Sequence, residues 1–579
     1  MSKLENELED IKGKLNFSST FRLAVALTTI TASYFLWSNP KFLVLTLFIG
    51  IAVFIFLVIR HNRYEYKKSL TNQLIKRNQK ELKVLDRGFH DLPEGLEFQD
   101  SEHSYGSDID LFGRGSFYQY LNRTVLASGS TALAQILLSN GIEQIGKKQT
   151  AIQELAEKPE WLQLFGATGS LVKVETTAKR VIDWLLQYQP FIPKKIKIGA
   201  YVFSSISLLL IAGYFMDLLS GFWVFFEFLL GMAITGRFLK KINKLSAHTS
   251  QIQHFFVQYS RLLALIENEE FASTLLHEKR NDIVNQQESS SEVLKNFSKL
   301  LDRLDQRNNI LISLFLNGFF LRDLVVCETI ETWISKNKFN ISKWFDTIAF
   351  FDAYISLGNY AFNHQDHVYP NIVNNNTILE AKQASHPMLE SHKAVRNDIK
   401  IAKDEFFIVT GANMAGKSTF FRTVALQLVM ANVVLSVSAQ SAKYSPIKLI
   451  TSMRTSDSLA DDESYFFSEL KRLKFIIDQM ESDEYFIVLD EILKGTNSID
   501  KAEGSQKFIK KLIKLGGTGI IATHDLSLCS VADNLENVTN FYFDANIVDD
   551  ELFFDYKFKK GICQNMNASF LLKKMGVVE

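Results

Sequence analysis

Cysteine is scarce in this chain, which holds only three in 579 residues. Cys327, Cys529 and Cys563 lie far apart and show none of the paired spacings of a metal site. They are also too few for a disulfide framework, which fits a reducing compartment such as the cytosol. A disulfide-stapled secreted fold and a cysteine-based metal site are therefore excluded.

The chain also carries no net charge. Lys+Arg and Asp+Glu are equal at 64 each, so no global charge draws the protein toward nucleic acid. The chain has no low-complexity segment, and its length predicts about three or four domains rather than one core. Phenylalanine is abundant, with 47 residues, and much of this excess lies in hydrophobic runs.

A phosphate-binding loop is the strongest motif. The segment 406–422 reads FFIVTGANMAGKSTFFR, and its Gly-x-x-x-x-Gly-Lys-Ser spacing is that of a Walker A loop between a buried strand and a helix. Its glycines let backbone N–H groups approach phosphate, its lysine supplies positive charge, and its serine hydroxyl suits Mg²⁺. The pattern predicts ATP and Mg²⁺ binding by Gly411, Ala412, Asn413, Met414, Ala415, Gly416, Lys417, Ser418 and Thr419.

Two further segments complete the expected site. Residues 485–491 read YFIVLDE, an apolar strand that ends in two acids, as in a Walker B motif. We expect Asp490, with Ser418, to hold the Mg²⁺ shell and Glu491 to orient or deprotonate the attacking water. A third strand over 519–523 ends at His524, which we expect to sense the γ-phosphate. Glu491 and His524 are thus the predicted catalytic residues.

These motifs together resemble the ATPase domain of the MutS family of DNA mismatch-repair proteins. The Asn-Met pair at 413–414 is far more specific than a generic Walker A loop. The resemblance is strong from about residue 380 to the end and weaker before it. The matching segments, in family order, are TGANMAGKST (410–419), SDSLADDESYFFSEL (456–470), DEILKGTNS (490–498), ATHDLSL (522–528) and YKFKKGICQNMNASFLLKKMG (556–576).

The resemblance implies several features that the motifs alone do not. The fold would be an α/β P-loop NTPase of the ABC type, MutS domain V, following an all-α core and lever domain. In the family a serine, here Ser464, acts across a subunit boundary, so the resemblance implies a homodimer with two composite ATP sites. DNA, mismatched or otherwise structured, is implied as a partner.

Two departures from the family pattern concern the nucleotide. Asp461, Asp462 and Glu463 precede Ser464, and each close acid would repel a γ-phosphate by roughly 1 kcal/mol or more at intermediate dielectric. Either Mg²⁺ or a nearby base offsets this repulsion, or the loop stays solvated. The aromatic residue that usually stacks on adenine corresponds to Ala394, so the sequence assigns no base-stacking side chain.

Long apolar runs occur in two pairs. The first pair covers 23–37 and 42–59, and the second covers 198–216 and 218–236. A membrane-spanning helix needs about 17 to 25 such residues, so the runs predict two transmembrane helical hairpins. No small-residue cleavage site separates the first two runs, which excludes a cleavable signal peptide.

The flanking charges predict the orientation of these hairpins. Basic residues lie outside both pairs of runs, whereas the short connecting turns hold only Lys41 and Asp217. By the positive-inside rule, every large segment then lies in the cytoplasm, and the protein is a multi-pass protein of the inner membrane in contact with lipid. The basic flanking residues are Arg60, Arg63, Lys67, Lys68, Lys194, Lys195, Lys197, Arg237, Lys240, Lys241 and Lys244.

One alternative is that these runs are core helices of a large soluble protein. Glu227 favours it, since a carboxylate within a bilayer costs roughly 2.5 to 3.5 kcal/mol on insertion scales. A role for Glu227 in helix packing or an interface ranks above a role in a proton path. The run 309–321 is too short to span a membrane and is expected to be a buried core helix.

The middle of the chain resembles the helical core and levers of MutS. The segments 110–138 and 147–164 resemble the core, 238–304 has the helical period of lever helices, and 343–361 resembles the helix by which the lever re-enters the ATPase. Nothing before residue 100 resembles the mismatch-reading module of the family, and no β-rich clamp insert is recognisable. We therefore hypothesise that membrane insertion replaces DNA clamping at the far end of the lever.

The expected organisation follows from these segments. The protein is predicted to be a membrane-anchored, MutS-like ATPase; the alternatives are a membrane transport ATPase or a nucleotide-gated membrane scaffold. No Leu-Ser-Gly-Gly-type signature precedes Walker B, which disfavours transport. The expected parts are a cytoplasmic segment (1–22), hairpin 1 (23–59), a basic juxtamembrane helix (60–99), a helical core (100–197), hairpin 2 (198–236), lever helices (237–379) and the ATPase domain (380–579).

Overall fold

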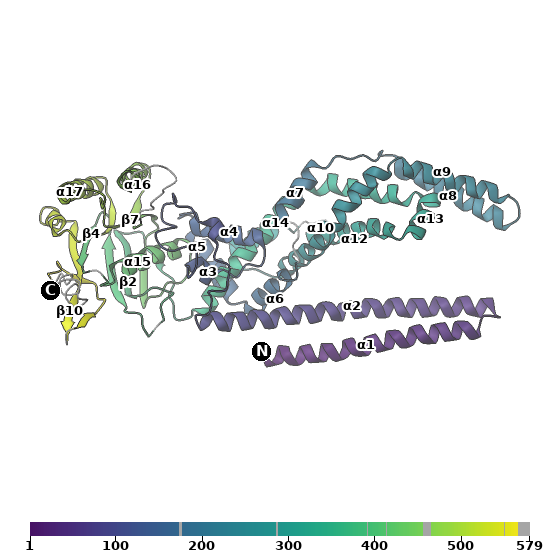
Figure 1. Cartoon of the computed structure of the whole chain (residues 1–579), viewed down its shortest axis with the longest axis horizontal. Coiled ribbons are helices and arrows are strands. Elements are labelled where there is room, and N and C mark those ends of the chain that lie inside the picture. Colours follow the sequence, from purple (N-terminus) through teal and green to yellow (C-terminus); the bar gives the residue numbers. More distant parts are fainter. Residues whose placement is uncertain are drawn as a thin grey trace.

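The computed structural model describes residues 1–172, 177–284, 288–390, 392–412, 414–454, 465–548 and 551–564. The molecule is elongated, with the strands gathered at one end and two helical hairpins directed toward the other (Figure 1). Every described strand lies after residue 370, so the carboxyl-terminal part is α/β and the part before it is helical.

The α/β part is built on a six-stranded sheet in the order β12-β9-β4-β8-β7-β6, parallel except for β12. The strand β4 is central and fully buried, which explains its continuous apolar sequence. A second sheet has the order β1-β5-β2-β3. The strands are β1 (Asn371–Ile372), β2 (Thr377–Ala384), β3 (Asn397–Ala402), β4 (Phe406–Gly411), β5 (Ser441–Tyr444), β6 (Lys448–Ser452), β7 (Tyr485–Asp490), β8 (Thr518–Ala522), β9 (Val538–Phe543), β10 (Ala545–Val548), β11 (Glu551–Phe554) and β12 (Lys559–Lys560).

The strands and the helix that the sequence predicts around the phosphate loop are present in this part. Strands expected near 406, 485 and 519 are confirmed as β4, β7 and β8, and the helix after the phosphate loop is confirmed as α15. Nearly every residue of α15 is buried, because the helix lies between the sheet and the helical part. The helices of this part are α15 (Lys417–Asn432), α16 (Tyr465–Met480), α17 (Ser498–Lys514) and the 3-10 helix η3 (Leu526–Val531).

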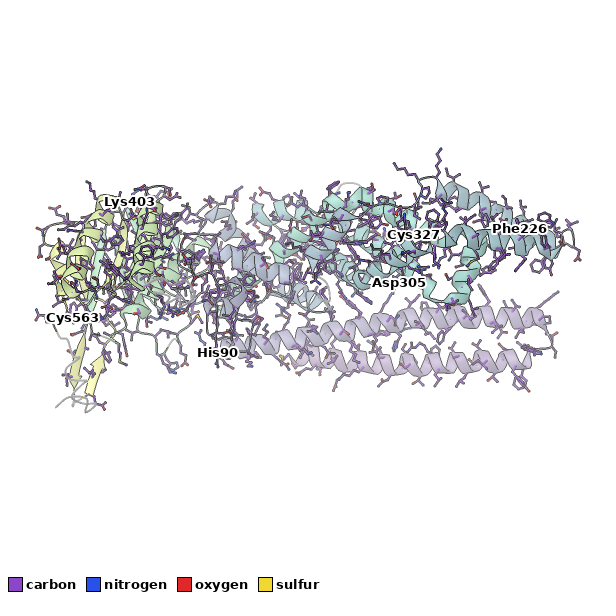
Figure 2. The ribbon with its side chains drawn as sticks, turned by 45° about the horizontal axis from the view of Figure 1, so that its top comes forward. His90, Phe226, Asp305, Cys327, Lys403 and Cys563 are labelled. Carbon is purple, nitrogen blue, oxygen red and sulfur yellow. The ribbon has the colours of Figure 1, made fainter. Side chains whose placement is uncertain are left out.

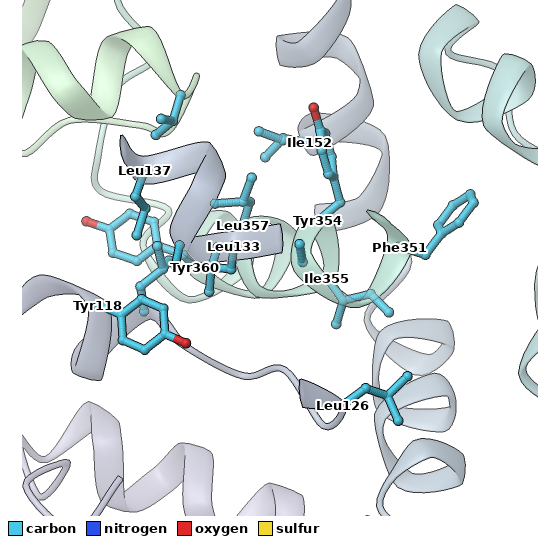
Figure 3. Packing of buried hydrophobic residues seen from close by; sticks show 14 of the residues in the cluster. Tyr118, Leu126, Leu133, Leu137, Ile152, Phe351, Tyr354, Ile355, Leu357 and Tyr360 are labelled. Atoms are coloured by element: carbon cyan, nitrogen blue, oxygen red, sulfur yellow. The ribbon is translucent and has the colours of Figure 1, made fainter. Parts of the chain in front are cut away.

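The helical part is organised around α14, a helix of 42 residues. Apolar side chains of α4, α5 and α14 pack against one another beside the α/β part. Among them are Leu133, Ile152 and Leu357 (Figure 3). The other helices are α1 (Ser2–Phe35), α2 (Pro40–Leu85), η1 (Leu96–Phe98), α3 (Phe117–Leu121), α4 (Ala127–Leu138), α5 (Ile145–Ala156), α6 (Pro159–Gly169), α7 (Ala178–Gln187), α8 (Ile196–Phe215), α9 (Gly221–Gly236), α10 (Leu239–Glu267), α11 (Thr274–Asn281), α12 (Ser290–Asp305), η2 (Gln306–Asn308), α13 (Ile310–Phe320) and α14 (Arg322–Asn363).

The first hairpin is joined to the core by the last turns of α2. The Glu81 carboxylate forms an ion pair with Arg123, at 2.6 Å, and accepts hydrogen bonds from the amides of Asn359 and Asn363 near the end of α14. Arg123 is almost fully buried, so this pair is shielded from water. The α2 helix, about 69 Å long at the usual rise per residue, is thereby fixed to the end of α14 that adjoins the α/β part.

Both hairpins point away from the α/β part, and the turns of both lie at the far end of the molecule (Figure 1). Among the described residues, α2 and α8 are long and apolar enough to cross a membrane; α9 meets that test only together with the start of α10, and α13 only together with α14. The first run of hairpin 1 lies in α1, which does not meet it. Polar residues and Arg22 lower the apolar character of α1.

The prediction of a buried core helix at 309–321 is wrong. This run forms α13, which packs against α8 and α9 but whose first half is exposed, with Leu311 at 81%. The segment 147–164, which resembles the MutS core, falls in two helices, α5 and α6, because Pro159 begins α6.

Asp352 lies in the centre of the helical core and supplies a test of its packing. Its carboxylate accepts hydrogen bonds from the backbone N–H groups of Val125 and Leu126, and burial raises its pKa to about 7. Because the folded pKa is raised, the stability that this group contributes is present below about pH 4 and is lost as the pH rises to about 7.

We expect this loss to amount to a free energy on the order of 4 kcal/mol. Asp352→Asn removes the titration and keeps an acceptor, so the melting temperature of the wild type should fall relative to that of the variant between pH 5 and pH 8. Asp346→Asn, an exposed aspartate of the same helix, is the control. A difference in melting temperature that does not change with pH would contradict the assignment.

Candidate nucleotide-binding site

The predicted phosphate loop connects β4 to α15 at the carboxyl edge of the sheet. Gly411 has a φ of 149° and Gly416 one of 97°, backbone conformations that favour glycine. A Cβ atom on Gly411 would also lie 2.7 Å from the Phe543 carbonyl oxygen. The two glycines that the motif requires are therefore fixed by backbone geometry, while Asn413 lies outside the described residues.

Lys417 begins α15 and is buried beneath this loop, with 7% of it exposed. Its Nζ donates to the carbonyl oxygens of Gly411, at 2.7 Å, and Ala412, at 2.9 Å. Burial lowers the pKa of Lys417, while the carboxylates of Asp490 and Glu491 act in the opposite direction. The ammonium group is therefore held at the amino end of a helix, where the helix dipole also favours an anion.

A hydroxyl and a carboxylate meet at the position expected for a metal ion. The Ser418 hydroxyl donates to Oδ2 of Asp490 at 2.9 Å. Asp490 ends β7, which is separated from β4 only by β8, so the parallel order brings the two side chains together. Oxygen donors of this kind fit Mg²⁺, which binds to one or two protein ligands and completes its shell with phosphate and water.

Glu491 follows β7 in a left-handed conformation, with φ 48°. Its backbone N–H donates to the Ala522 carbonyl oxygen at 3.0 Å, which fixes the start of this loop to β8. Its carboxylate lies 3.7 Å from Nζ of Lys501 and 3.9 Å from Nζ of Lys494. The candidate general base is thus turned toward the site and paired with two cations.

His524 follows β8 and lies on the other side of Lys417, with Nε2 3.3 Å from its Nζ. Burial, together with the Lys417 charge, lowers the pKa of His524. The imidazole is therefore neutral at pH 7 and can donate one hydrogen bond.

These side chains surround one cavity of about 300 Å³. Gly411 and Ala415 are buried behind it, and Ser464, like Asn413, lies outside the described residues. The cavity brings together nine of the predicted residues and adds Lys494. Its lining is Ala412, Met414, Gly416, Lys417, Ser418, Thr419, Asp490, Glu491, Lys494 and His524.

Glu469 is a site residue that the sequence analysis missed. It is 2% exposed, and its carboxylate accepts hydrogen bonds from the backbone N–H groups of Leu493, at 2.5 Å, and Lys494, at 3.0 Å. Leu493 has a φ of 58°, unfavourable for a branched side chain, so Glu469 stabilises the loop that carries Glu491. The sequence does hold one signal for a role of Glu469. An acid stands on the apolar face of a predicted helix, three residues after Phe466 and four residues before Leu473.

Tyr556 was also missed as a neighbour of the loop. A Cβ atom on Gly416 would lie 2.9 Å from Cδ1 of its ring. The backbone there is fixed by Asn397, whose side chain donates to the Tyr556 carbonyl oxygen and accepts from the Phe558 N–H group. Tyr556 is 42% exposed, and its ring, which stacks on Phe554 at 5.9 Å, lies beside the phosphate loop.

The helical core reaches the site through a loop before α3. The Asp108 carboxylate accepts from the Thr451 hydroxyl at 2.5 Å and from the Met453 and Arg454 N–H groups, just after β6. Arg422, one turn after the phosphate loop in α15, donates to the Asp108 carbonyl oxygen and pairs with Asp110 at 3.4 Å. Both the phosphate-loop helix and the end of β6 are thereby attached to the helical core.

Comparison with known proteins agrees with this geometry. Residues 407–573 match the family described as MutS domain V. The chain is 28% identical to MutS protein homolog 4 of Homo sapiens over 255 residues, which are 42% of this chain and 27% of the relative. It is 30% identical to DNA mismatch repair protein MutS of Finegoldia magna over 296 residues, which are 49% of this chain and 33% of the relative.

A third relative, DNA mismatch repair protein MutS of Fusobacterium nucleatum, is 36% identical to this chain over 173 residues. These are 28% of this chain and 19% of the relative. The matches thus span a fifth to a third of the length of these relatives. They support a MutS-type ATPase domain at the carboxyl end of a chain whose other described part is helical.

Glu469 provides a test of how the site is held. Glu469→Ala leaves two buried N–H groups without an acceptor, at about 1 to 3 kcal/mol each. We expect turnover of ATP to fall about tenfold or more while the Michaelis constant changes little, because the loop carries Glu491 and not the phosphate contacts. Phosphate release measures this, with Glu469→Gln intermediate and exposed Glu481→Ala as the control. Unchanged turnover in a folded Glu469→Ala protein would refute the role.

Proposed function

We propose that this chain hydrolyses ATP at the β4 loop, as a MutS-like protein anchored in a membrane. The observation that supports the ATPase most directly is the meeting of Lys417, the Ser418 and Asp490 pair, Glu491 and His524 around one cavity. They come from three adjacent strand ends, an arrangement that local sequence similarity alone does not produce.

The residues have distinct roles in this proposal. Lys417 exchanges the carbonyl oxygens of its own loop for phosphate oxygens of ATP, and the N–H groups of the loop hold the remaining phosphate charge. Mg²⁺, bound by Ser418 and Asp490, neutralises phosphate charge when it is present. Glu491 accepts a proton from the attacking water as ADP and phosphate form, and His524 donates a hydrogen bond to the γ-phosphate.

Tyr556 takes the place of the aromatic residue that is missing at Ala394. Its exposed ring lies beside Gly416, and stacking of the base on this ring would orient the nucleotide over the loop. The hydrogen bonds of Asn397 to the backbone of Tyr556 and Phe558 hold the segment that carries the ring.

The proposal extends to a homodimer and to DNA. The relatives are named as DNA mismatch-repair and MutS homologue proteins, and family resemblance would have Ser464 act on the site of the partner subunit. Balanced overall charge gives no independent support for DNA, so this part rests on the resemblance.

Membrane anchoring is supported by the apolar faces of the hairpins. In both hairpins large side chains such as Phe48, Phe56, Leu209 and Phe226 are at least half exposed. Exposed apolar surface on this scale is costly in water. Because both hairpins extend in one direction, a single bilayer fits around both, with the ATPase domain in the cytoplasm (Figure 1).

Two variants test the hydrolysis of ATP. Lys417→Ala removes the buried ammonium and should weaken binding of ATP about 10- to 100-fold or more. Glu491→Ala should bind ATP normally and lower turnover about 100-fold or more, so that ATP stays trapped. Exposed Lys507→Ala is the matched control. The measurement is binding and phosphate release by the detergent-solubilised full chain.

The same assay decides the remaining parts of the proposal. Homoduplex, mismatched and branched DNA are added in turn, and stimulation by one of them would identify DNA as a partner. Binding of ATP without turnover would identify a nucleotide-gated scaffold instead. Equal turnover by the wild type, Lys417→Ala and Glu491→Ala would eliminate the mechanism.

The role of Tyr556 has its own test. Loss of base stacking costs about 1 to 3 kcal/mol, so Tyr556→Ala should weaken ATP binding by about 5- to 100-fold. Tyr556→Phe keeps the ring and should bind like the wild type. Inorganic triphosphate, which has no base, should bind equally to all three forms. Unchanged affinity of Tyr556→Ala for ATP would rule out stacking.

A further inference from the structure

The helix α13 has an unusual position between the lever and the second hairpin. It joins η2 to α14 and is bent by 84° from α14. Its eleven residues extend about 16 Å, roughly half the thickness of a hydrocarbon core of about 30 Å. Asp305, at the end of α12, and Cys327, in the second turn of α14, lie at a similar level along the molecule, while Phe226 lies nearer the hairpin tip (Figure 2). The helices before and after α13 therefore lie at one level near it.

The last turn of α13 packs tightly on the hairpin. A Cβ atom on Gly231 of α9 would lie 2.0 Å from the Gly318 carbonyl oxygen, and one on Gly318 would lie 2.2 Å from the Phe228 ring. Phe228 and Phe319 are in ring contact at 5.4 Å. Two helix backbones approach this closely only where glycine is present, as is common between helices within membranes.

The first half of α13 is apolar and has no cover among the described residues. The run 310–321 contains no charged residue. Its exposed side chains continue the exposed apolar surface of α8 and α9. They are Ile310 at 71%, Leu311 at 81%, Ile312 at 50%, Leu314 at 40% and Phe315 at 53%.

Polar groups close both ends of this apolar run. Asn309 caps the first turn, and Asn317 accepts a hydrogen bond from the Asp323 N–H group at 2.9 Å. Arg307 pairs with the buried Asp323 at 3.1 Å, and Arg322 donates to the Arg303 carbonyl oxygen at 3.0 Å. Three arginines thus gather where the chain enters and leaves α13, a position that favours the polar surface of a bilayer.

We infer that α13 is embedded in lipid as a short, non-spanning helix beside α8 and α9. This inference rests on the proposed membrane anchoring and adds a third membrane element to it. Lipid is the occupant that fits, because the uncharged face is continuous with that of the hairpin and is bordered by arginines. The start of α14, which continues to the ATPase, is thereby held at the membrane surface.

Fluorescent probes on single introduced cysteines test this inference. The three native cysteines are buried and so react slowly. Leu311→Cys places the probe on α13, and Leu209→Cys places it on α8 as the reference for the hairpin. Phe339→Cys, 74% exposed on α14 away from the hairpin, is the matched apolar control. The full chain is reconstituted in vesicles of zwitterionic and anionic lipid, with nitroxide near the headgroup end of the acyl chains or with aqueous iodide.

We expect lipid nitroxide to quench the probes at Leu311 and Leu209 roughly twofold or more, and iodide to quench the probe at Phe339 alone. Quenching at Leu209 but not at Leu311 would overturn the inference and leave membrane anchoring intact. Quenching by lipid at neither position would refute both. A probe at Leu311 that is shielded from lipid nitroxide and from iodide would be covered by protein, which also overturns the inference.

Discussion

The Asp108 carboxylate is the contact on which the arrangement of the two halves depends. It is 6% exposed and receives hydrogen bonds from a hydroxyl and two backbone N–H groups at the end of β6. A buried carboxylate is stable only with such donors, so the loop that carries it must stay seated on the ATPase sheet. Arg472 strengthens the junction by donating to the carbonyl oxygens of His103 and Ser104.

From this junction, polar contacts continue through the helical core to the hairpins. Asp352 on α14 holds the backbone at Val125 and Leu126, two and three residues after Arg123, which is the partner of Glu81 on α2. Removing one member of such a pair leaves the other buried and uncompensated, which costs several kcal/mol. The helical core and the ATPase domain can therefore move relative to each other only if the partners in each of these pairs move together. Any shift of α15 would act through Arg422 on the same loop.

The sequence predicts the geometry of the phosphate loop well, because a loop of this kind depends on local backbone conformation. Gly411, Gly416, Lys417 and the acids after β7 lie where their spacing indicates, since each is placed by its own strand end. Glu469 and Tyr556 could not be found in that way, because their roles depend on which distant backbone they meet. The error at α13 has another origin. Composition shows that a helix avoids water, but not whether protein or lipid covers it.

The proposed anchoring and the lever geometry have one mechanical consequence. The α2 helix ends against Arg123 beside the ATPase, and α14 begins at α13 and ends near the same place. Two long helices thus connect the hairpin end of the molecule to one region of the core. A bilayer around both hairpins would hold their far ends together, so a shift at the nucleotide site would have to bend a helix or tilt a hairpin. Tilting costs only fractions of a kcal/mol per Å of mismatch, far less than breaking the buried Glu81 pair. Movement would therefore reach the membrane rather than be absorbed in the core.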